Sequence, residues 1–151
     1  MPYPTRLPAE LRAAFRRLRD AGPDGERLAS YLVEKNPRFW LNPFFLRPGG
    51  GLALVLPLFG RLLCLGARGI DSDLRAGLLA HEATHLAQDD AHHNWVSSQA
   101  DEVQAYQVQG RVLNALGRGE GFLWSAAEAQ RYAPAQAEAL APHLGMSAEQ
   151  F

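Results

Sequence analysis

The sequence is poor in cysteine and lysine, and it carries almost no net charge. A single cysteine, Cys64, occurs in 151 residues, which excludes an internal disulfide and fits a reducing compartment. The formal net charge at pH 7 is −1, so there is no electrostatic basis for binding nucleic acid. We therefore expect a protein without a DNA or RNA partner.

The chain also lacks a long uninterrupted hydrophobic run. The longest apolar stretch, residues 51–66, is broken by a proline, a glycine and an arginine, and is too short to span a bilayer. Residues 1–20 contain no apolar segment typical of a secretory signal peptide. These features predict a cytoplasmic protein with no membrane partner. The length predicts one domain, residues 1–151, with a core of its own.

What the chain does contain is the motif HExxH, from His81 to His85. Residues i and i+4 share one face of a helix, so His81 and His85 can offer two imidazole nitrogens to one metal ion. Glu82 is turned by about 100° from His81, so it lies beside such a metal rather than at it. Two neutral nitrogens suit Zn²⁺, and a neighbouring carboxylate suits a general base that activates water. The motif predicts a zinc-dependent hydrolase in which Glu82 is catalytic.

The residues around the motif indicate a buried helix. Residues 73–89 contain no proline, and either Asp71 or Ser72 can cap their N-terminus. Leucine and alanine occupy nearly every face of this segment, as in a helix that is buried on all sides. Two histidines and a glutamate in such a place cost free energy unless they are paired or bind a metal. This setting favours a metal site over a helix that carries two histidines by chance.

A catalytic zinc ion usually has three protein ligands, so a third must be found. The longer motif HExxHxxGxxH is absent, because Gln88 and Ala91 stand at its glycine and third-histidine positions. Residues 97–116 predict the next helix, and Glu102 lies near the middle of its apolar face. Asp101 lies at the edge of that face. Because a carboxylate on an apolar face needs compensation, we predict Glu102 as the third ligand, with a Glu–Arg pair as the alternative.

HExxH followed by Glu-x-x-Ala-Tyr on the next helix resembles the gluzincin class of zinc metallopeptidases. The short chain is similar to the minimal prokaryotic members of that class, which are called minigluzincins. The resemblance covers residues 73–116. It implies a zinc ion on His81, His85 and Glu102, Glu82 as general base, and hydrolysis of a peptide or protein substrate.

One position departs from that class. Many gluzincins carry an aspartate four residues after the glutamate ligand, where it orients the first histidine, and this chain has Tyr106 there. The Tyr106 hydroxyl and Gln109 are the candidates for that task. No residue matches a family position for stabilising the oxyanion. By chemistry alone the candidates are Arg131, Tyr132 and His143.

The adjacent residues His92 and His93 fall in the predicted connection between the two helices. Exposure in a polar loop is the simplest interpretation. The alternatives are a different third ligand for the metal or an oxyanion donor.

The expected fold is α+β: a mainly helical zincin-like domain with a small antiparallel sheet or hairpin and an HExxH active-site helix. Helices over 8–21 and 25–35 precede a hairpin of two strands, 52–57 and 61–65. The strand edge of this hairpin is a candidate for pairing with extended substrate. The aromatic residues Phe39, Trp40, Phe44 and Phe45 are expected to pack against it, with a substrate-binding lip as the alternative. A last helix over 125–142 is expected to break near Pro134.

A function of a different class would use the same metal site. The protein could be a zinc-binding regulatory or structural domain that turns over little and acts through a protein partner. The two hypotheses differ in whether Glu82 and an open coordination position matter. The sequence indicates neither the substrate nor the oligomeric state.

Overall fold

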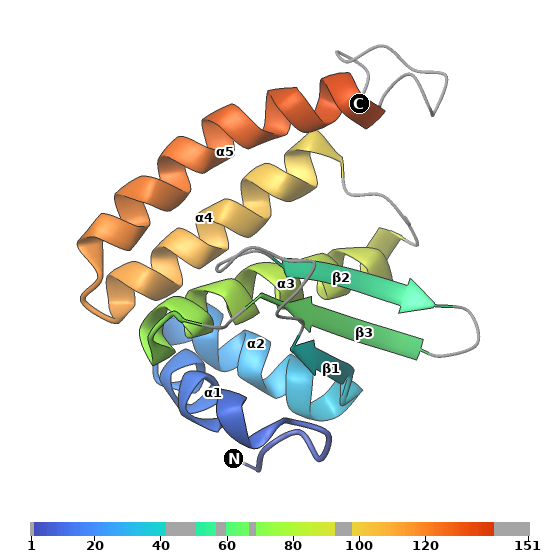
Figure 1. Ribbon diagram of the computed structural model, residues 1–151, viewed down its shortest axis with the longest axis vertical. Coiled ribbons are helices and arrows are strands. Elements are labelled where there is room, and N and C mark those ends of the chain that lie inside the picture. The colour runs from blue at the N-terminus through green and yellow to red at the C-terminus, as the bar shows by residue number, and fades with distance from the viewer. Residues whose placement is uncertain (1, 42–50, 57–59, 67–68, 93–97, 141–151) are drawn as a thin grey trace.

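The computed structural model describes residues 2–41, 51–56, 60–66, 69–92 and 98–140, and these form helices around a small sheet (Figure 1). A short 3₁₀ turn, Ala9–Leu11, opens the described structure. The helices are α1 (Arg12–Arg19), α2 (Gly22–Lys35), α3 (Ser72–His92), α4 (Gln99–Ala115) and α5 (Gly119–Leu140). The strands are β1 (Arg38–Leu41), β2 (Gly51–Leu56) and β3 (Gly60–Leu65). The predicted α+β class is confirmed.

The motif helix α3 runs through the middle of the molecule (Figure 1). It contacts α1, α2 and α4 as well as β2 and β3, so its apolar residues are covered on several sides. Ala76, Leu79, Ala80 and Ala83 are fully buried. The prediction of a buried motif helix is confirmed, and the helix extends three residues beyond the predicted end at residue 89.

Asp71 caps the N-terminus of α3. Its Oδ1 accepts hydrogen bonds from the backbone N–H groups of Asp73 and Leu74, at 3.0 and 2.9 Å. An aspartate at this position satisfies amides that have no partner inside the helix, and its charge complements the helix dipole. Of the two predicted capping residues, Asp71 and Ser72, Asp71 therefore makes the cap of α3.

The sheet has the order β1-β3-β2 and is mixed. β2 pairs with β3 in antiparallel orientation, with Leu56 opposite Gly60, whereas β1 pairs with β3 in parallel. The expectation of an antiparallel sheet is therefore wrong for β1. A parallel pair is joined by a long crossover, so its partner strand is distant in sequence and leaves no local signal.

The aromatic segment around residues 39–45 was not expected to contain a strand. Phe39 of β1 packs against the core, as predicted, whereas Trp40 on the opposite side of the strand is 52% exposed. Alternation of this kind is ordinary for a strand with one buried face. Phe44 and Phe45 lie outside the described residues, so their predicted packing stays a prediction.

Two prolines act differently from expectation, one at the start of a helix and one inside a helix. Pro23 lies in the first turn of α2, where its fixed φ suits a helix start, so α2 begins at Gly22 rather than at residue 25. Pro134 lies inside α5, which runs unbroken from Gly119 to Leu140, so the predicted break is wrong. A proline removes one backbone hydrogen bond, and the contact of α5 with α4 together with an alanine-rich sequence outweighs that loss.

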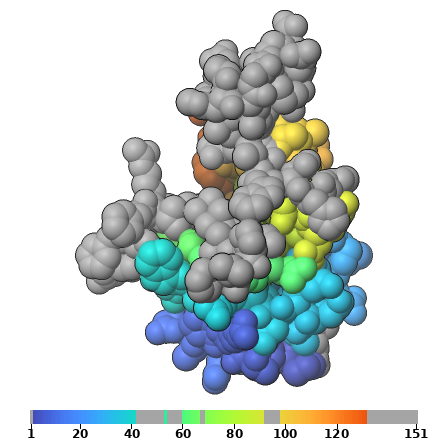
Figure 2. All heavy atoms as spheres, turned by 90° about the vertical axis from the view of Figure 1, so that its right-hand side faces the viewer, coloured from blue at the N-terminus to red at the C-terminus, as the bar shows by residue number. Residues whose placement is uncertain are grey.

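The N-terminal helices form the base of the molecule, and α4 lies toward the opposite end (Figure 2). Among the helices that the structure describes, none combines the length and apolarity needed to cross a bilayer.

Candidate metal centre

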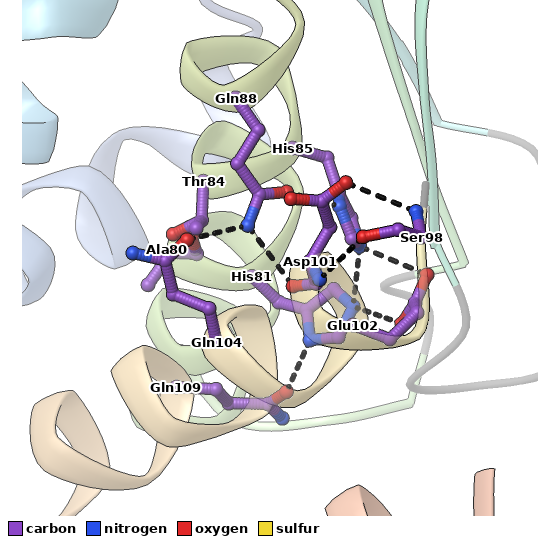
Figure 3. Close-up of polar contacts among 10 residues, drawn as sticks. All are labelled: Ala80, His81, Thr84, His85, Gln88, Ser98, Asp101, Glu102, Gln104 and Gln109. Atoms are coloured by element: carbon purple, nitrogen blue, oxygen red, sulfur yellow. Dashed lines mark hydrogen bonds and ion pairs between the residues drawn. The ribbon is translucent and has the colours of Figure 1, made fainter. Parts of the chain in front are cut away.

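The structure brings His81, His85 and Glu102 together between α3 and α4 (Figure 3). His85 Nε2 lies 3.2 Å from His81 Nε2 and 3.2 Å from Glu102 Oε1. His81 Nε2 lies 3.6 Å from Glu102 Oε2. Both histidines therefore direct the same ring nitrogen toward the same carboxylate, and the three residues predicted as metal ligands converge.

Two of these separations are close to the edge of a metal tetrahedron. Zinc bonds of about 2.0–2.1 Å at tetrahedral angles place neighbouring ligand atoms about 3.3–3.4 Å apart. The two distances of 3.2 Å from His85 Nε2 lie near that value, and with one ligand atom from each residue the three atoms lie within 4.8 Å of one another. The donor set of two imidazole nitrogens and one carboxylate oxygen is also one that zinc accepts. The residues present therefore fit a metal ion of this kind.

A close approach of α3 and α4 makes this convergence possible. Gly77 lies one turn before His81, and a Cβ atom there would come within 2.9 Å of the Leu113 side chain on α4. Glycine at this position removes that clash and lets the two helices pack closely. Glu102, which is only 5% exposed, can then reach the two histidines.

Glu102 and His85 perturb one another electrostatically. Burial alone would raise the pKa of Glu102, but the adjacent imidazoles of His81 and His85 outweigh burial and lower it to about 2. Burial alone would lower the pKa of His85, but contact with Glu102 outweighs it and raises the pKa. The site thus holds Glu102 as a carboxylate, which is the form that binds a metal.

Gln109 of α4 holds the first histidine. Its Oε1 lies 3.0 Å from His81 Nδ1, the ring nitrogen opposite to the one that faces Glu102. Tyr106, in the position where many gluzincins have aspartate, packs its ring edge-on against the His81 ring at a centroid distance of 4.5 Å. Of the two candidates named from the sequence, Gln109 makes the hydrogen bond to His81 and Tyr106 supplies ring packing.

Glu82 is buried beside these residues, with 4% of its surface exposed. Burial raises the pKa of its carboxyl group, the charges of His81 and His85 lower it, and Glu102 raises it further. The net direction is upward. Glu82 thus lies next to the three converging side chains without belonging to the group itself.

The alternatives to Glu102 as third ligand were Asp101, His92 and His93, and the structure describes the backbone position of the first two. Asp101 forms a capping box with Ser98 at the start of α4: its carboxylate accepts from the Ser98 N–H at 2.9 Å, and the Ser98 hydroxyl accepts from the Asp101 N–H at 3.1 Å. His92 is the last residue of α3 rather than part of a loop. His93 lies outside the described residues, so its role stays open.

Of the three candidates for oxyanion stabilisation, the structure describes only one in full. Arg131 is an exposed residue of α5. Tyr132 is placed on α5 by its backbone, and His143 lies outside the described residues. Cys64 is buried in β3, as predicted for a small apolar side chain, and burial raises the pKa of its thiol.

A cavity of about 370 Å³ shares Gln109 with the site, although none of the three converging residues lines it. It lies between α3, α4 and the start of α5, and Gln109 forms part of its wall. Most of its other lining is apolar, from Leu74, Leu78, Leu113 and Trp124, while Arg118 and Glu120 add charge. Its size falls at the small end of the range for ligand pockets.

Comparison of the chain with protein-family models, with curated proteins and with solved structures found no match.

Proposed function

We propose that this protein is a zinc-dependent peptidase with a zincin-like fold of the gluzincin type. The observation that carries the proposal is the convergence of His81, His85 and Glu102, in which His85 Nε2 lies 3.2 Å from both His81 Nε2 and Glu102 Oε1, close to the edge of a zinc tetrahedron. The burial of Glu82 directly beside this group adds a carboxylate that the ligand set does not use. A structural zinc site usually has four protein ligands, and the three that converge among the described residues favour a catalytic one.

The residues of the chain have distinct roles in this proposal. Bound zinc supplies a Lewis acid that polarises the scissile carbonyl and lowers the pKa of water to about 7. Glu82 accepts a proton from the attacking water and returns it to the nitrogen of the leaving amine. Gln109 keeps His81 oriented during this exchange, since the ring cannot turn without losing the bond at Nδ1.

Two features near the site suit a peptide substrate. β2 is an outer strand of the sheet among the described residues and contacts α3, so its outer edge is the candidate for pairing with an extended chain. The cavity beside Gln109 is large enough for an apolar side chain of that peptide. These two features make a peptide a better candidate than a small polar molecule.

The proposal is tested by incubating the native protein with a broad peptide library and reading the products by mass spectrometry. We expect cleavage that stops when a zinc chelator is added and returns when zinc is restored in slight excess. Zinc binding at about one ion per chain without any cleavage would reject the peptidase and support a zinc-binding regulatory domain. Absence of zinc binding would reject both.

A further inference from the structure

Gln88 lies one turn after His85 on α3, and its side-chain amide spans the gap to α4 (Figure 3). Its Oε1 lies 2.8 Å from His85 Nδ1. Its Nε2 donates to the backbone carbonyl of Asp101 at 3.0 Å and to Gln104 Oε1 at 2.9 Å. The sequence analysis named Gln88 only as the residue that breaks a longer zinc motif.

The partners of Gln88 determine which way its amide points. A backbone carbonyl is only an acceptor, so the NH₂ end of the amide must face Asp101. The oxygen end must then face His85 Nδ1, and this contact is a hydrogen bond only when Nδ1 carries the proton. A ring bound to Gln88 through Nδ1 turns its other nitrogen, Nε2, toward Glu102 Oε1 at 3.2 Å.

The same amide also connects two metal ligands through the backbone. Asp101 immediately precedes Glu102 and belongs to the capping box that starts α4. A bond from Gln88 to the Asp101 carbonyl therefore fixes the first turn of α4 against the end of α3 at the height of the site. Gln88 orients the ring of His85 at one end and restrains the backbone beside Glu102 at the other.

From these contacts we infer that Gln88 is a positioning residue of the metal centre. It holds the Nδ1 side of the His85 ring and restrains the first turn of α4 against α3, so that His85 Nε2 and Glu102 meet. The inference rests on the proposed function only for the identity of the metal. Because the amide is neutral, it orients the imidazole without adding a second negative charge to the site.

The first test measures the zinc dissociation constant by competition with a chelator. Gln88→Met keeps the length of the side chain and removes both hydrogen bonds, and we expect zinc affinity to fall about 10–100-fold. Gln104→Met is the matched control: it removes the second acceptor of Gln88 and leaves the Asp101 carbonyl in place, so affinity stays within about 2-fold. Thermal unfolding of the metal-free proteins shows whether either variant loses structure.

The second test follows the His85 Nδ1 proton in metal-free protein by ¹H–¹⁵N NMR of the imidazole ring. We expect this proton to exchange slowly with water in the native protein, because Gln88 Oε1 accepts it, and faster in Gln88→Met. Equal exchange in the two proteins overturns the inference, as does an unchanged zinc affinity in Gln88→Met. This reading needs neither zinc nor turnover, so it decides the role of Gln88 even if the native protein binds no zinc and the proposed function fails.

Discussion

Asp90 near the end of α3 is a partly buried carboxylate and Glu102 opposite its middle is a buried one, and they have different partners. Asp90 accepts hydrogen bonds from Arg61 and from the Tyr31 hydroxyl, the latter at 2.8 Å. Glu102 faces two imidazoles, whose charge depends on protonation or on a metal. A permanent cation completes the first cluster in every state of the protein. The second cluster is complete only with a proton or a metal, and this difference separates a structural ion pair from a binding site.

The sharpest way to break this comparison is to change the buried carboxylate that neither cluster uses. Glu82→Gln keeps the shape of the side chain and removes the base, so zinc should stay bound while hydrolysis falls by several orders of magnitude. General-base assistance alone is worth about 10²–10⁴. Peptide cleavage by mass spectrometry and zinc content by elemental analysis check the two parts. A variant that cleaves as fast as the native protein contradicts the assigned role of Glu82.

Removing the third ligand is expected to have the next largest effect. Glu102→Ala leaves two histidines, and zinc affinity should fall by more than about 100-fold, since loss of an outer partner alone costs 10–100-fold. Asp101→Ala is its neighbour control: it should keep the zinc and lose about 1 kcal/mol of stability through the capping box. Chelator competition measures the affinity. The opposite pattern would show that Asp101 is the ligand.

A smaller effect is expected at the residue that orients the first histidine. Gln109→Met removes the acceptor at His81 Nδ1 and should weaken zinc binding about 10-fold, at the lower end of such effects, because Tyr106 still packs on the ring. Tyr106→Phe keeps the ring and removes only the hydroxyl, so it measures separately what the second candidate contributes to zinc affinity. Equal affinity of Gln109→Met and native protein would remove Gln109 from the site.

The smallest effect is expected on replacing Asp90, the carboxylate that pairs with Arg61 and Tyr31. Burial alone would raise the pKa of Asp90, but hydrogen bonds from Arg61 and Tyr31 outweigh it, so the net pKa is lowered. A lowered carboxyl pKa contributes stability above the unfolded value of about 3.9, and that stability is lost as the pH falls through the folded value. Asp90→Asn should therefore cost about 1 kcal/mol at pH 7, and the difference from native protein should shrink below about pH 4.

Urea unfolding of the native protein and of Asp90→Asn at pH 7 and pH 3.5 measures this difference. Zinc affinity at pH 7 is the control and should be the same for both proteins, because Asp90 lies outside the ligand group. A variant with native stability but weakened zinc binding would show that the two clusters are coupled, which contradicts the comparison.

The sequence was sufficient to predict the elements that form the site. Both helices follow from their periodicity, and Glu102 was selected over Asp101 because only Glu102 lies in the middle of an apolar face. The roles of the side-chain amides of Gln109 and Gln88 were harder to predict from the sequence. Gln109 was one of two candidates, and Gln88 could have been suspected from its i,i+3 spacing to His85, but its bond to Asp101 depends on how α3 and α4 pack.

The prediction failed where the deciding partner is distant in the chain. β1 is a strand because it pairs with β3, and β2 lies between these two strands in the sequence. The four residues of β1 alone do not reveal this partner. α5 continues through Pro134, although local rules favour a break, and it packs against α4. In both cases tertiary contacts outweigh local propensity.

Glu102 is also the residue whose N–H makes the first backbone hydrogen bond of α4, to the Ser98 carbonyl at 3.1 Å. The first turn of a helix is where fraying is most frequent, and such local opening needs far less free energy than unfolding of the core. The residence time of a bound metal ion is therefore tied to the opening rate of a single helical turn. Amide hydrogen exchange in that turn would slow when the metal binds, while exchange in the rest of α4 would change little.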